Sequence, residues 1–277
     1  MLEYPEATTI AKELNEVIKG KRISIVQLQA SSHKFAFFSK DVDYETLLIG
    51  KTVGFAKAYG GLVQIQIGDN HLYFGDGANL RYYDCREKLP EKHQLLLGFE
   101  GDTFVVVSIQ MYGRISLYTP TTELAFYDRV AMEKPPMDSD EFQYEYFRKV
   151  FDESDKKLSA KAFLATEQRF PGLGNGILQD ILWHAGIHPK TKIMNLKDEE
   201  IKKLYSSLRD RISDMVELGG RNTEKDLFGK AGGYQLILSK DTMNTPCPRC
   251  HTKIERKAFL GGNIYYCANC QKESKTS

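Results

Sequence analysis

The chain has 277 residues, of which 42% are hydrophobic and 27% are charged, and its formal net charge is +1. This length allows two compact regions with separate hydrophobic cores. No run of about 18 apolar residues occurs, and the first thirty residues lack the basic, apolar and small-residue succession of a secretory signal. These features exclude a helical membrane protein, and we expect a globular, cytoplasmic protein.

The charge is unevenly distributed along the chain. Residues 221–277 contain ten lysine and arginine residues and five acidic ones, so this segment carries +5 and the first 220 residues together carry −4. The same basic segment contains four of the five cysteines, and Cys85 is the fifth. A basic C-terminal region is compatible with a polyanionic partner.

The N-terminal half is predicted to contain one helix followed by strands. From Pro5 to Gly20, apolar residues recur at helical spacing, with proline near the start and glycine at the end. Eight segments rich in Val, Ile, Tyr and Phe follow, separated by glycine turns. They are Arg22–Gln29, Phe35–Ser39, Lys51–Ala56, Leu62–Ile67, His71–Phe74, Leu95–Phe99, Phe104–Gln110 and Ile115–Tyr118. This spacing predicts an antiparallel β-sandwich or barrel.

The pattern changes at residues 133–141, where charged residues and prolines replace the alternation and indicate a linker. Helical spacing follows it, and a strand pattern returns only near the cysteines. The predicted helices are Phe142–Phe151, Ala160–Gln168, Gly176–Ala185 and Asp198–Leu218, and the predicted strand is Tyr234–Leu238.

Four cysteines form two C-x-x-C pairs, Cys247 with Cys250 and Cys267 with Cys270, separated by sixteen residues. Without a signal peptide, this pattern favours a metal site over disulfides. Two such turns can place four thiolates around one zinc ion at about 2.3 Å, which leaves no open position for catalysis. The alternation of Lys253–Phe259 and Asn263–Tyr266 about two glycines predicts a β-hairpin between the pairs. We therefore expect one structural zinc ion per chain, with two redox dithiols as the alternative.

A glycine-rich loop, Pro171-Gly172-Leu173-Gly174-Asn175, interrupts two helical patterns. Such a loop presents free backbone N–H groups and the positive end of a helix dipole, which suits a phosphate. A plain helix–turn–helix corner is the alternative.

Residues 161–190 closely resemble the helix–two-turn–helix signature of the formamidopyrimidine-DNA glycosylase and endonuclease VIII family. The resemblance extends through Phe228–Tyr234 to the cysteine pairs, and back to Leu2–Glu6. It implies an α+β fold that begins with an N-terminal helix and an antiparallel β-sandwich. The implied divisions are a β-sandwich domain at residues 1–132, a linker at 133–141, a helix–two-turn–helix DNA-binding domain at 142–240 and a four-cysteine zinc finger at 241–277.

The resemblance also implies residues that bind DNA. Lys161 and Asn175 match the family's phosphate-contacting lysine and asparagine, and Gly174 belongs to the same loop. Lys230 lies in a segment that covers the flipped base in some relatives. Either Gly262 or Asn263 lies where the family has a phosphate-clamping arginine. The expected partner is damaged double-stranded DNA, bound by a monomer associated with the nucleoid.

The implied catalytic residues lie at the N-terminus. Family members begin, after removal of methionine, with a proline whose amine attacks the sugar carbon, and a nearby glutamate assists proton transfer. Here Leu2 occupies the proline position, whereas Glu3 and Glu6 remain in register. Because leucine disfavours removal of the initiator, we expect the Met1 amine to be the available nucleophile. Hydrolysis, with Glu3 or Glu6 activating water, is the other route.

The resemblance thus implies a base-excision-repair DNA glycosylase that hydrolyses the N-glycosidic bond of a flipped base. The absent proline weighs against strand cleavage. Together with a strand lysine missing at Gly60–Val63 and the missing finger arginine, it favours a protein without catalysis. A non-catalytic DNA-binding or lesion-sensing protein on the same scaffold is the alternative, with Glu3 and Glu6 then only complementing a helix dipole. A zinc ribbon that binds RNA or protein is a third hypothesis.

Overall fold

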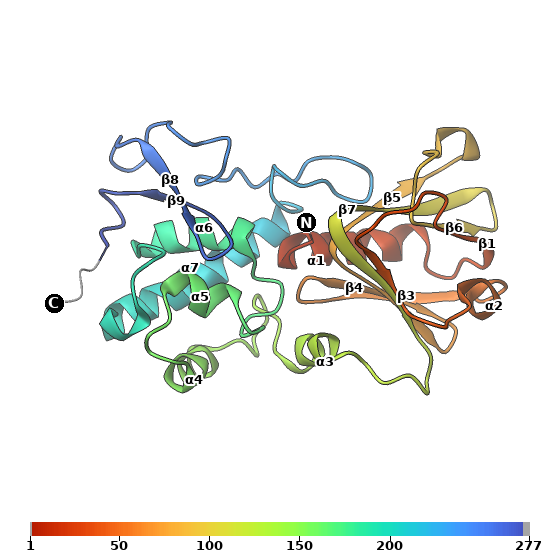
Figure 1. Cartoon of the computed structure of the whole chain (residues 1–277), viewed down its shortest axis with the longest axis horizontal. Helices are drawn as coiled ribbons and strands as arrows, with labels where there is room; N and C mark the ends of the chain where they lie inside the picture. Colours follow the sequence, from red (N-terminus) through yellow and green to blue (C-terminus); the bar gives the residue numbers. More distant parts are fainter. Residues whose placement is uncertain (1, 274–277) are drawn as a thin grey trace.

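The computed structural model describes residues 2–273 and places a β-rich half beside a helical half, with helix α1 (Tyr4–Val17) between them (Figure 1). Pro5 lies in the first turn of α1, where its missing N–H costs no hydrogen bond. The apolar stripe predicted from the sequence buries Ala7, Ile10 and Leu14. This helix is therefore anchored along its length by the β-rich half.

The β-rich half contains one seven-stranded sheet in the order β1-β6-β7-β5-β4-β3, with β2 paired to β7. The strands are β1 (Ile23–Leu28), β2 (Ala36–Phe38), β3 (Val53–Tyr59), β4 (Leu62–Ile67), β5 (Asn70–Tyr83), β6 (Leu95–Phe99) and β7 (Thr103–Tyr118). Side chains from β4 and β6, which are not neighbours, belong to one core together with α1. The sheet therefore folds over a shared core, and the prediction of a mainly antiparallel β-sandwich is confirmed. The exception is β2, which runs parallel to β7.

Two strands are longer than predicted. β5 continues beyond His71–Phe74 to Tyr83, and β7 joins two segments that the sequence pattern separated. Their register shifts between Asp76 and Ala78, which marks a β-bulge. A Cβ atom at Gly77 would overlap carbonyl oxygens of β7, so the two backbones approach closely at this bulge.

The helical half packs around an aromatic core. Its helices are α4 (Tyr144–Glu153), α5 (Ala160–Ala165), α6 (Asn175–Ala185) and α7 (Asp198–Glu217), close to the predicted ranges. The core includes Phe142, Phe147, Phe163 and Phe170 and also accepts Tyr4 from α1. Because α1 contributes to both cores, it joins the two halves.

Several local expectations differ from the structure. Helix α5 ends three residues before the predicted Gln168, since Glu167 and Gln168 both adopt positive φ. The predicted strand Tyr234–Leu238 is not formed, because the N–H groups of Ile237 and Leu238 donate to the Asp180 side chain instead of a neighbouring strand. Two short helices were not predicted: α2 (Tyr44–Leu48) and α3 (Phe126–Glu133).

The predicted hairpin is present as β8 (Ile254–Phe259) and β9 (Gly262–Cys267), which pair antiparallel. It packs against α6 through Trp183, Ile254 and Tyr265. The cysteine region therefore rests directly on the helix that follows the glycine-rich loop (Figure 1). Among residues 2–273, no helix combines the length and the apolar character that crossing a membrane requires.

Candidate nucleic-acid interface and cavity

The four cysteines of the two pairs converge beside the β8–β9 hairpin. Their Sγ atoms all lie within 4.8 Å of one another, and the Cys247–Cys270 and Cys250–Cys267 separations are 3.8 and 3.4 Å. Four sulfurs around a tetrahedral zinc ion at about 2.3 Å lie about 3.8 Å apart. The cluster could therefore hold one metal ion, whereas two independent dithiols have no reason to meet.

The hairpin meets the glycine-rich loop at the N-terminus of α6. Lys161 donates from Nζ to the Phe259 carbonyl at 2.7 Å, and Asn175 donates from Nδ2 to the Asn263 carbonyl at 3.0 Å. Gln179, one turn along α6, also donates to the Asn263 carbonyl and accepts from the Tyr265 N–H. These bonds fix the hairpin on the helix end. They also bring together Lys161, Asn175 and Asn263, which are distant in the sequence.

The N-terminus of α6 is capped by a side chain from the start of the chain. The Glu3 carboxylate accepts the N–H groups of Gly176 and Ile177, both at 2.9 Å. A Cβ atom at Gly174 would lie 2.5 Å from Glu3 Oε1. Glycine is therefore required at position 174 because the carboxylate approaches the helix end closely, and Gly174 makes this capping contact possible.

Glu6 lies one turn further along α1 and pairs with Arg221. Arg221 donates to the Glu6 carboxylate from Nε at 2.9 Å and from Nη2 at 2.7 Å, while its Nη1 lies 3.3 Å from Glu3 Oε2. All three side chains are at least nine-tenths buried. Both carboxylates near the N-terminus are thus held by one buried guanidinium, as a network rather than as isolated charges.

The electrostatics of this network follow from its burial. Burial raises the pKa of Glu3, while Arg221 and the N–H of Gly176 act in the opposite direction. Burial would lower the pKa of Arg221, but Glu3 and Glu6 outweigh it and raise that pKa above its ordinary value. Arg221 therefore stays charged. It was not recognised in the sequence, because its partners are more than 200 residues away.

A cavity of about 470 Å³ lies between the β-rich half and the loop before α6. Leu2 and Glu3 line it, together with Asp76 of β5, Arg114 of β7 and Asp128 of α3. The Leu2 N–H donates to the Asp76 carbonyl at 2.7 Å. The cavity therefore opens directly beside the start of the chain. Met1 itself lies outside the described residues.

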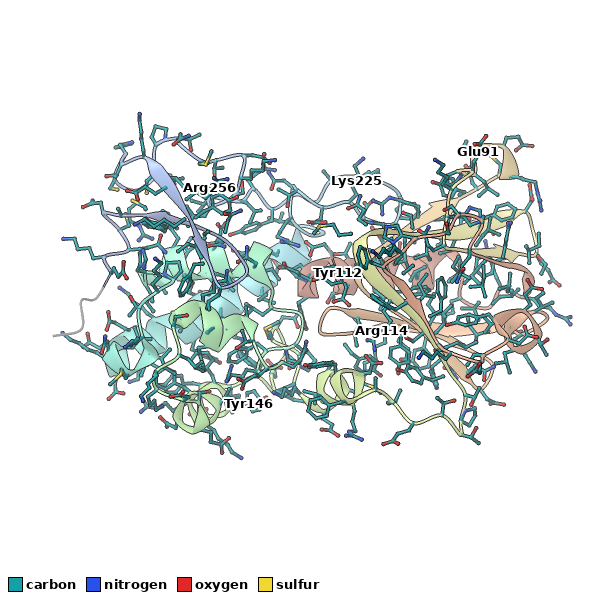
Figure 2. All side chains as sticks on the ribbon, in the orientation of Figure 1. Glu91, Tyr112, Arg114, Tyr146, Lys225 and Arg256 are labelled. Atoms are coloured by element: carbon teal, nitrogen blue, oxygen red, sulfur yellow. The ribbon has the colours of Figure 1, made fainter. Side chains whose placement is uncertain are left out.

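Charged groups on the opposite wall of this cavity are paired. Arg114 and Asp128 form a two-point ion pair, in which Nη1 donates to Oδ2 at 2.9 Å, and the Tyr118 hydroxyl donates to the same oxygen at 2.7 Å. Asp128 is fully buried, and Arg114 remains partly exposed. Figure 2 shows Arg114 directed into the space between the two halves.

Two exposed apolar side chains lie near this opening. Met111 and Tyr112 are on the β7 side of the bulge, with relative exposures of 75% and 43%. Met111 adopts a positive φ, which lifts the strand away from regular pairing. Figure 2 shows Tyr112 near the middle of the molecule, at the end of the sheet that faces the helices. The sequence pattern did not mark them, since they fall between two predicted strands that the structure joins in β7.

The last DNA-binding candidate, Lys230, lies elsewhere. Its loop is joined to β5 by a hydrogen bond from the Tyr82 N–H to the Leu227 carbonyl, at 2.9 Å. The loop is closed by Asp226, whose side chain accepts the N–H groups of Phe228 and Lys230. Lys230 is exposed, on a loop held beside β5. Figure 2 shows Lys225 on the same loop, which bridges the two halves.

The geometry agrees with comparisons to known proteins. Residues 133–226 match the family model for the formamidopyrimidine-DNA glycosylase H2TH domain. The formamidopyrimidine-DNA glycosylase of Lactobacillus delbrueckii subsp. bulgaricus is 27% identical, over 98% of this chain and 100% of that protein. The enzyme of the same name from Enterococcus faecalis is 25% identical, over 98% of each chain.

Solved structures share the fold over the whole chain. The MutM (Fpg) protein of Thermus thermophilus has a TM-score of 0.80 at 21% identity, covering 99% of this chain and 100% of that one. The Lactococcus lactis Fpg in complex with abasic-site DNA has a TM-score of 0.81 at 23% identity, covering 98% and 100%. The chain is therefore similar over nearly its whole length to formamidopyrimidine-DNA glycosylases and shares their fold, and its H2TH match lies within the helical half.

Proposed function

We propose that this protein is a DNA glycosylase of base excision repair, which removes a damaged base from double-stranded DNA. One observation carries the proposal: the N-terminus of α6 serves two sites at once. On one side it meets Lys161, Asn175 and the hairpin, and on the other it is capped by Glu3, which lines the cavity. A phosphate bound at the helix end therefore places its own nucleotide beside the cavity.

DNA binding is assigned to the junction of α6 and the hairpin. The Glu3 carboxylate already binds the N–H groups of Gly176 and Ile177, so a phosphate here would be held by the Lys161 ammonium and the Asn175 amide. Burial lowers the pKa of Lys161, and a phosphate bound beside its ammonium would act in the opposite direction. Asn263 contributes by positioning Asn175, and the exposed Arg256 and Lys257 extend the basic surface along β8. Lys230 would contact DNA from the opposite side of the opening.

We further infer that the four cysteines hold one structural zinc ion. The sulfur separations of 3.4 and 3.8 Å suit four thiolates around a tetrahedral ion. Such a site contributes folding free energy and no chemistry, because it leaves no position open to substrate. Its task here would be to hold the hairpin against α6, where Asn263 and Phe259 fix the side chains of the phosphate site.

Chemistry is assigned to the cavity at the start of the chain. Cleavage of the N-glycosidic bond develops positive charge on the sugar, and the fixed Glu3 carboxylate would stabilise it. Glu6 would act through Arg221, which holds Glu3 in place. The Met1 amine offers a covalent route that leads to strand cleavage. With Leu2 in place of the family's proline, we favour hydrolysis and expect little lyase activity.

The test is base release from duplexes that contain a formamidopyrimidine, an 8-oxoguanine or an oxidised pyrimidine. We expect free base from at least one duplex and a large loss of release in Glu3→Gln. The matched control is Glu91→Gln, which lies at the far end of the sheet (Figure 2). Tight binding of these duplexes without release of any base would contradict the proposal and support the non-catalytic alternative.

Borohydride trapping of the protein on abasic-site DNA distinguishes the covalent route through the Met1 amine from hydrolysis. A covalent adduct that maps to Met1 would show amine chemistry and strand cleavage. Base release without an adduct would support hydrolysis. Competition between RNA and duplex DNA for binding is a separate test, because a preference for RNA would contradict DNA as the partner.

A further inference from the structure

Asp76 is a carboxylate that the network at the N-terminus does not use. It lies at the β5 bulge opposite Gly113, with φ of +57°. Its backbone carbonyl accepts the Leu2 N–H at 2.7 Å, and the residue lines the same cavity as Leu2 and Glu3. The bulge therefore fixes a carboxylate beside the start of the chain.

The other carboxylates of this cavity already have strong donors. Glu3 accepts two backbone N–H groups at 2.9 Å and lies 3.3 Å from Arg221. Asp128 accepts both Arg114 and the Tyr118 hydroxyl. Hydrogen bonds to the charged form stabilise it, and such a carboxylate is a weak proton acceptor. Within residues 2–273, no N–H or O–H group donates to the Asp76 carboxylate, and its side chain is solvent-accessible.

We propose that Asp76 is the general base of the reaction, and that it activates the water which displaces the damaged base. The proposal rests on the glycosylase function proposed above. The water oxygen forms a bond to C1′ while the C1′–N bond breaks. Asp76 takes one proton from that water. The departing base keeps the bonding electron pair and takes up a proton, so the products are a free base and an abasic site.

The surroundings of Asp76 suit this role. Burial raises its pKa, Arg114 lowers it and the nearby Asp128 raises it, with a net increase above the ordinary value for aspartate. A carboxylate with a raised pKa accepts a proton more readily than a fully solvated one. Arg114, Asp128 and Glu3 are the charged side chains that face Asp76 from the neighbouring elements. Arg114 outweighs Asp128 in its effect on the pKa of Asp76, so the increase comes from burial.

Asp76→Asn is a close test, because asparagine tolerates positive φ and keeps the size of the side chain. The matched control is Asp102→Asn, which has φ of +55° in the turn between β6 and β7 and is exposed far from the cavity. Single-turnover base release and affinity for the same lesion duplex are measured for both variants. General-base catalysis typically contributes 10²- to 10⁴-fold.

We expect Asp76→Asn to release base at least about 100-fold more slowly, to bind the duplex within about twofold of wild type and to lose the acidic limb of the pH–rate profile. Asp102→Asn should match wild type in all three. Wild-type release by Asp76→Asn, equal losses in both variants, or a borohydride-trapped adduct on the wild-type path would each overturn the role of Asp76. Absence of release by the wild-type protein would instead contradict the glycosylase function itself.

Discussion

The hairpin junction and the cavity lie on opposite sides of one helix end, but they are built differently. At the junction, Lys161 and Asn175 are fixed by backbone carbonyls of the hairpin. In the cavity, Glu3, Asp76 and Arg114 come from three separate elements and are placed by the tertiary fold alone. By the resemblance, the proposed binding surface keeps Lys161 and Asn175 but lacks the hairpin arginine, and the cavity has Leu2 at the proline position.

This difference indicates that binding and chemistry can change independently in this protein. The proposed phosphate site depends on local geometry, which a cavity substitution at Asp76 or Arg114 leaves in place because neither residue contacts α6 or the hairpin through a hydrogen bond. The two regions are joined by Glu3, which caps α6 and also lines the cavity, and by Arg221 behind it. Experiments that measure DNA affinity and base release separately therefore test whether the two regions can change independently.

The largest effect is expected from loss of the metal. Cys250→Ser, or removal of zinc with a chelator, should unfold the hairpin, since metal binding supplies about 10–16 kcal/mol in zinc-finger peptides. The proposed phosphate site would then lose Phe259 and Asn263, and affinity for duplex DNA should fall by more than about 100-fold. Zinc content and fluorescence anisotropy measure the two changes. Cys85→Ser, outside the cluster, should retain both. Full affinity in a zinc-free protein would contradict the role of the hairpin.

The Arg221→Met variant tests the buried ion-pair network that connects the two regions. It leaves the Glu3 and Glu6 carboxylates buried without their cation, and breaking such a pair costs about 3–5 kcal/mol of unfolding free energy. Urea unfolding provides the measurement. The control is Arg129→Met, whose pair with Glu123 spans 3.6 Å at the surface and should cost at most about 1 kcal/mol. Similar losses of unfolding free energy in the two variants would show that the buried network does not stabilise the fold.

The next prediction concerns Asp180 of α6, which holds the segment that leads to the cysteines. Its carboxylate accepts the Ile237 and Leu238 N–H groups, and burial raises its pKa to about 6. A raised pKa means that the folded state binds the proton more tightly. Relative to Asp180→Asn, wild type should therefore gain stability as the pH falls from 6 to 4, by up to about 3 kcal/mol. Urea unfolding across this range measures the difference, and a constant value would contradict the assignment.

The smallest effect is expected at a single phosphate contact. Lys161→Met should weaken duplex binding by about tenfold, and the slope of log affinity against log salt should fall by about 0.9. Damaged and undamaged duplexes should lose affinity equally, because phosphate contacts carry no base information. Lys149→Met, on the exposed face of α4, is the matched control and should bind as wild type. A loss confined to damaged DNA would place Lys161 at the lesion instead.

The sequence by itself determined the parts that depend on short-range spacing. Two C-x-x-C pairs predicted a four-sulfur cluster, and the glycine-rich loop predicted the start of a helix, because both require residues only a few positions apart. The predicted helix ranges lay close to the observed ones for the same reason. The prediction of free N–H groups at this helix end was wrong for Gly176 and Ile177, since Glu3 from the start of the chain accepts both. The strand pattern at Tyr234–Leu238 was misleading, since a side chain, Asp180, accepts the N–H groups that a strand partner would have accepted.

Only the tertiary structure decided which charges meet. Arg221 contacts Glu3 and Glu6 across more than 200 residues, and Asp76 reaches the start of the chain because a bulge turns β5 there. No local pattern encodes such contacts, because they arise from how the folded sheet and the helices pack around α1. The sequence therefore predicted Glu3 as a functional residue, whereas the structure shows that its carboxylate is already bound and that the Asp76 carboxylate, within residues 2–273, accepts no hydrogen bond.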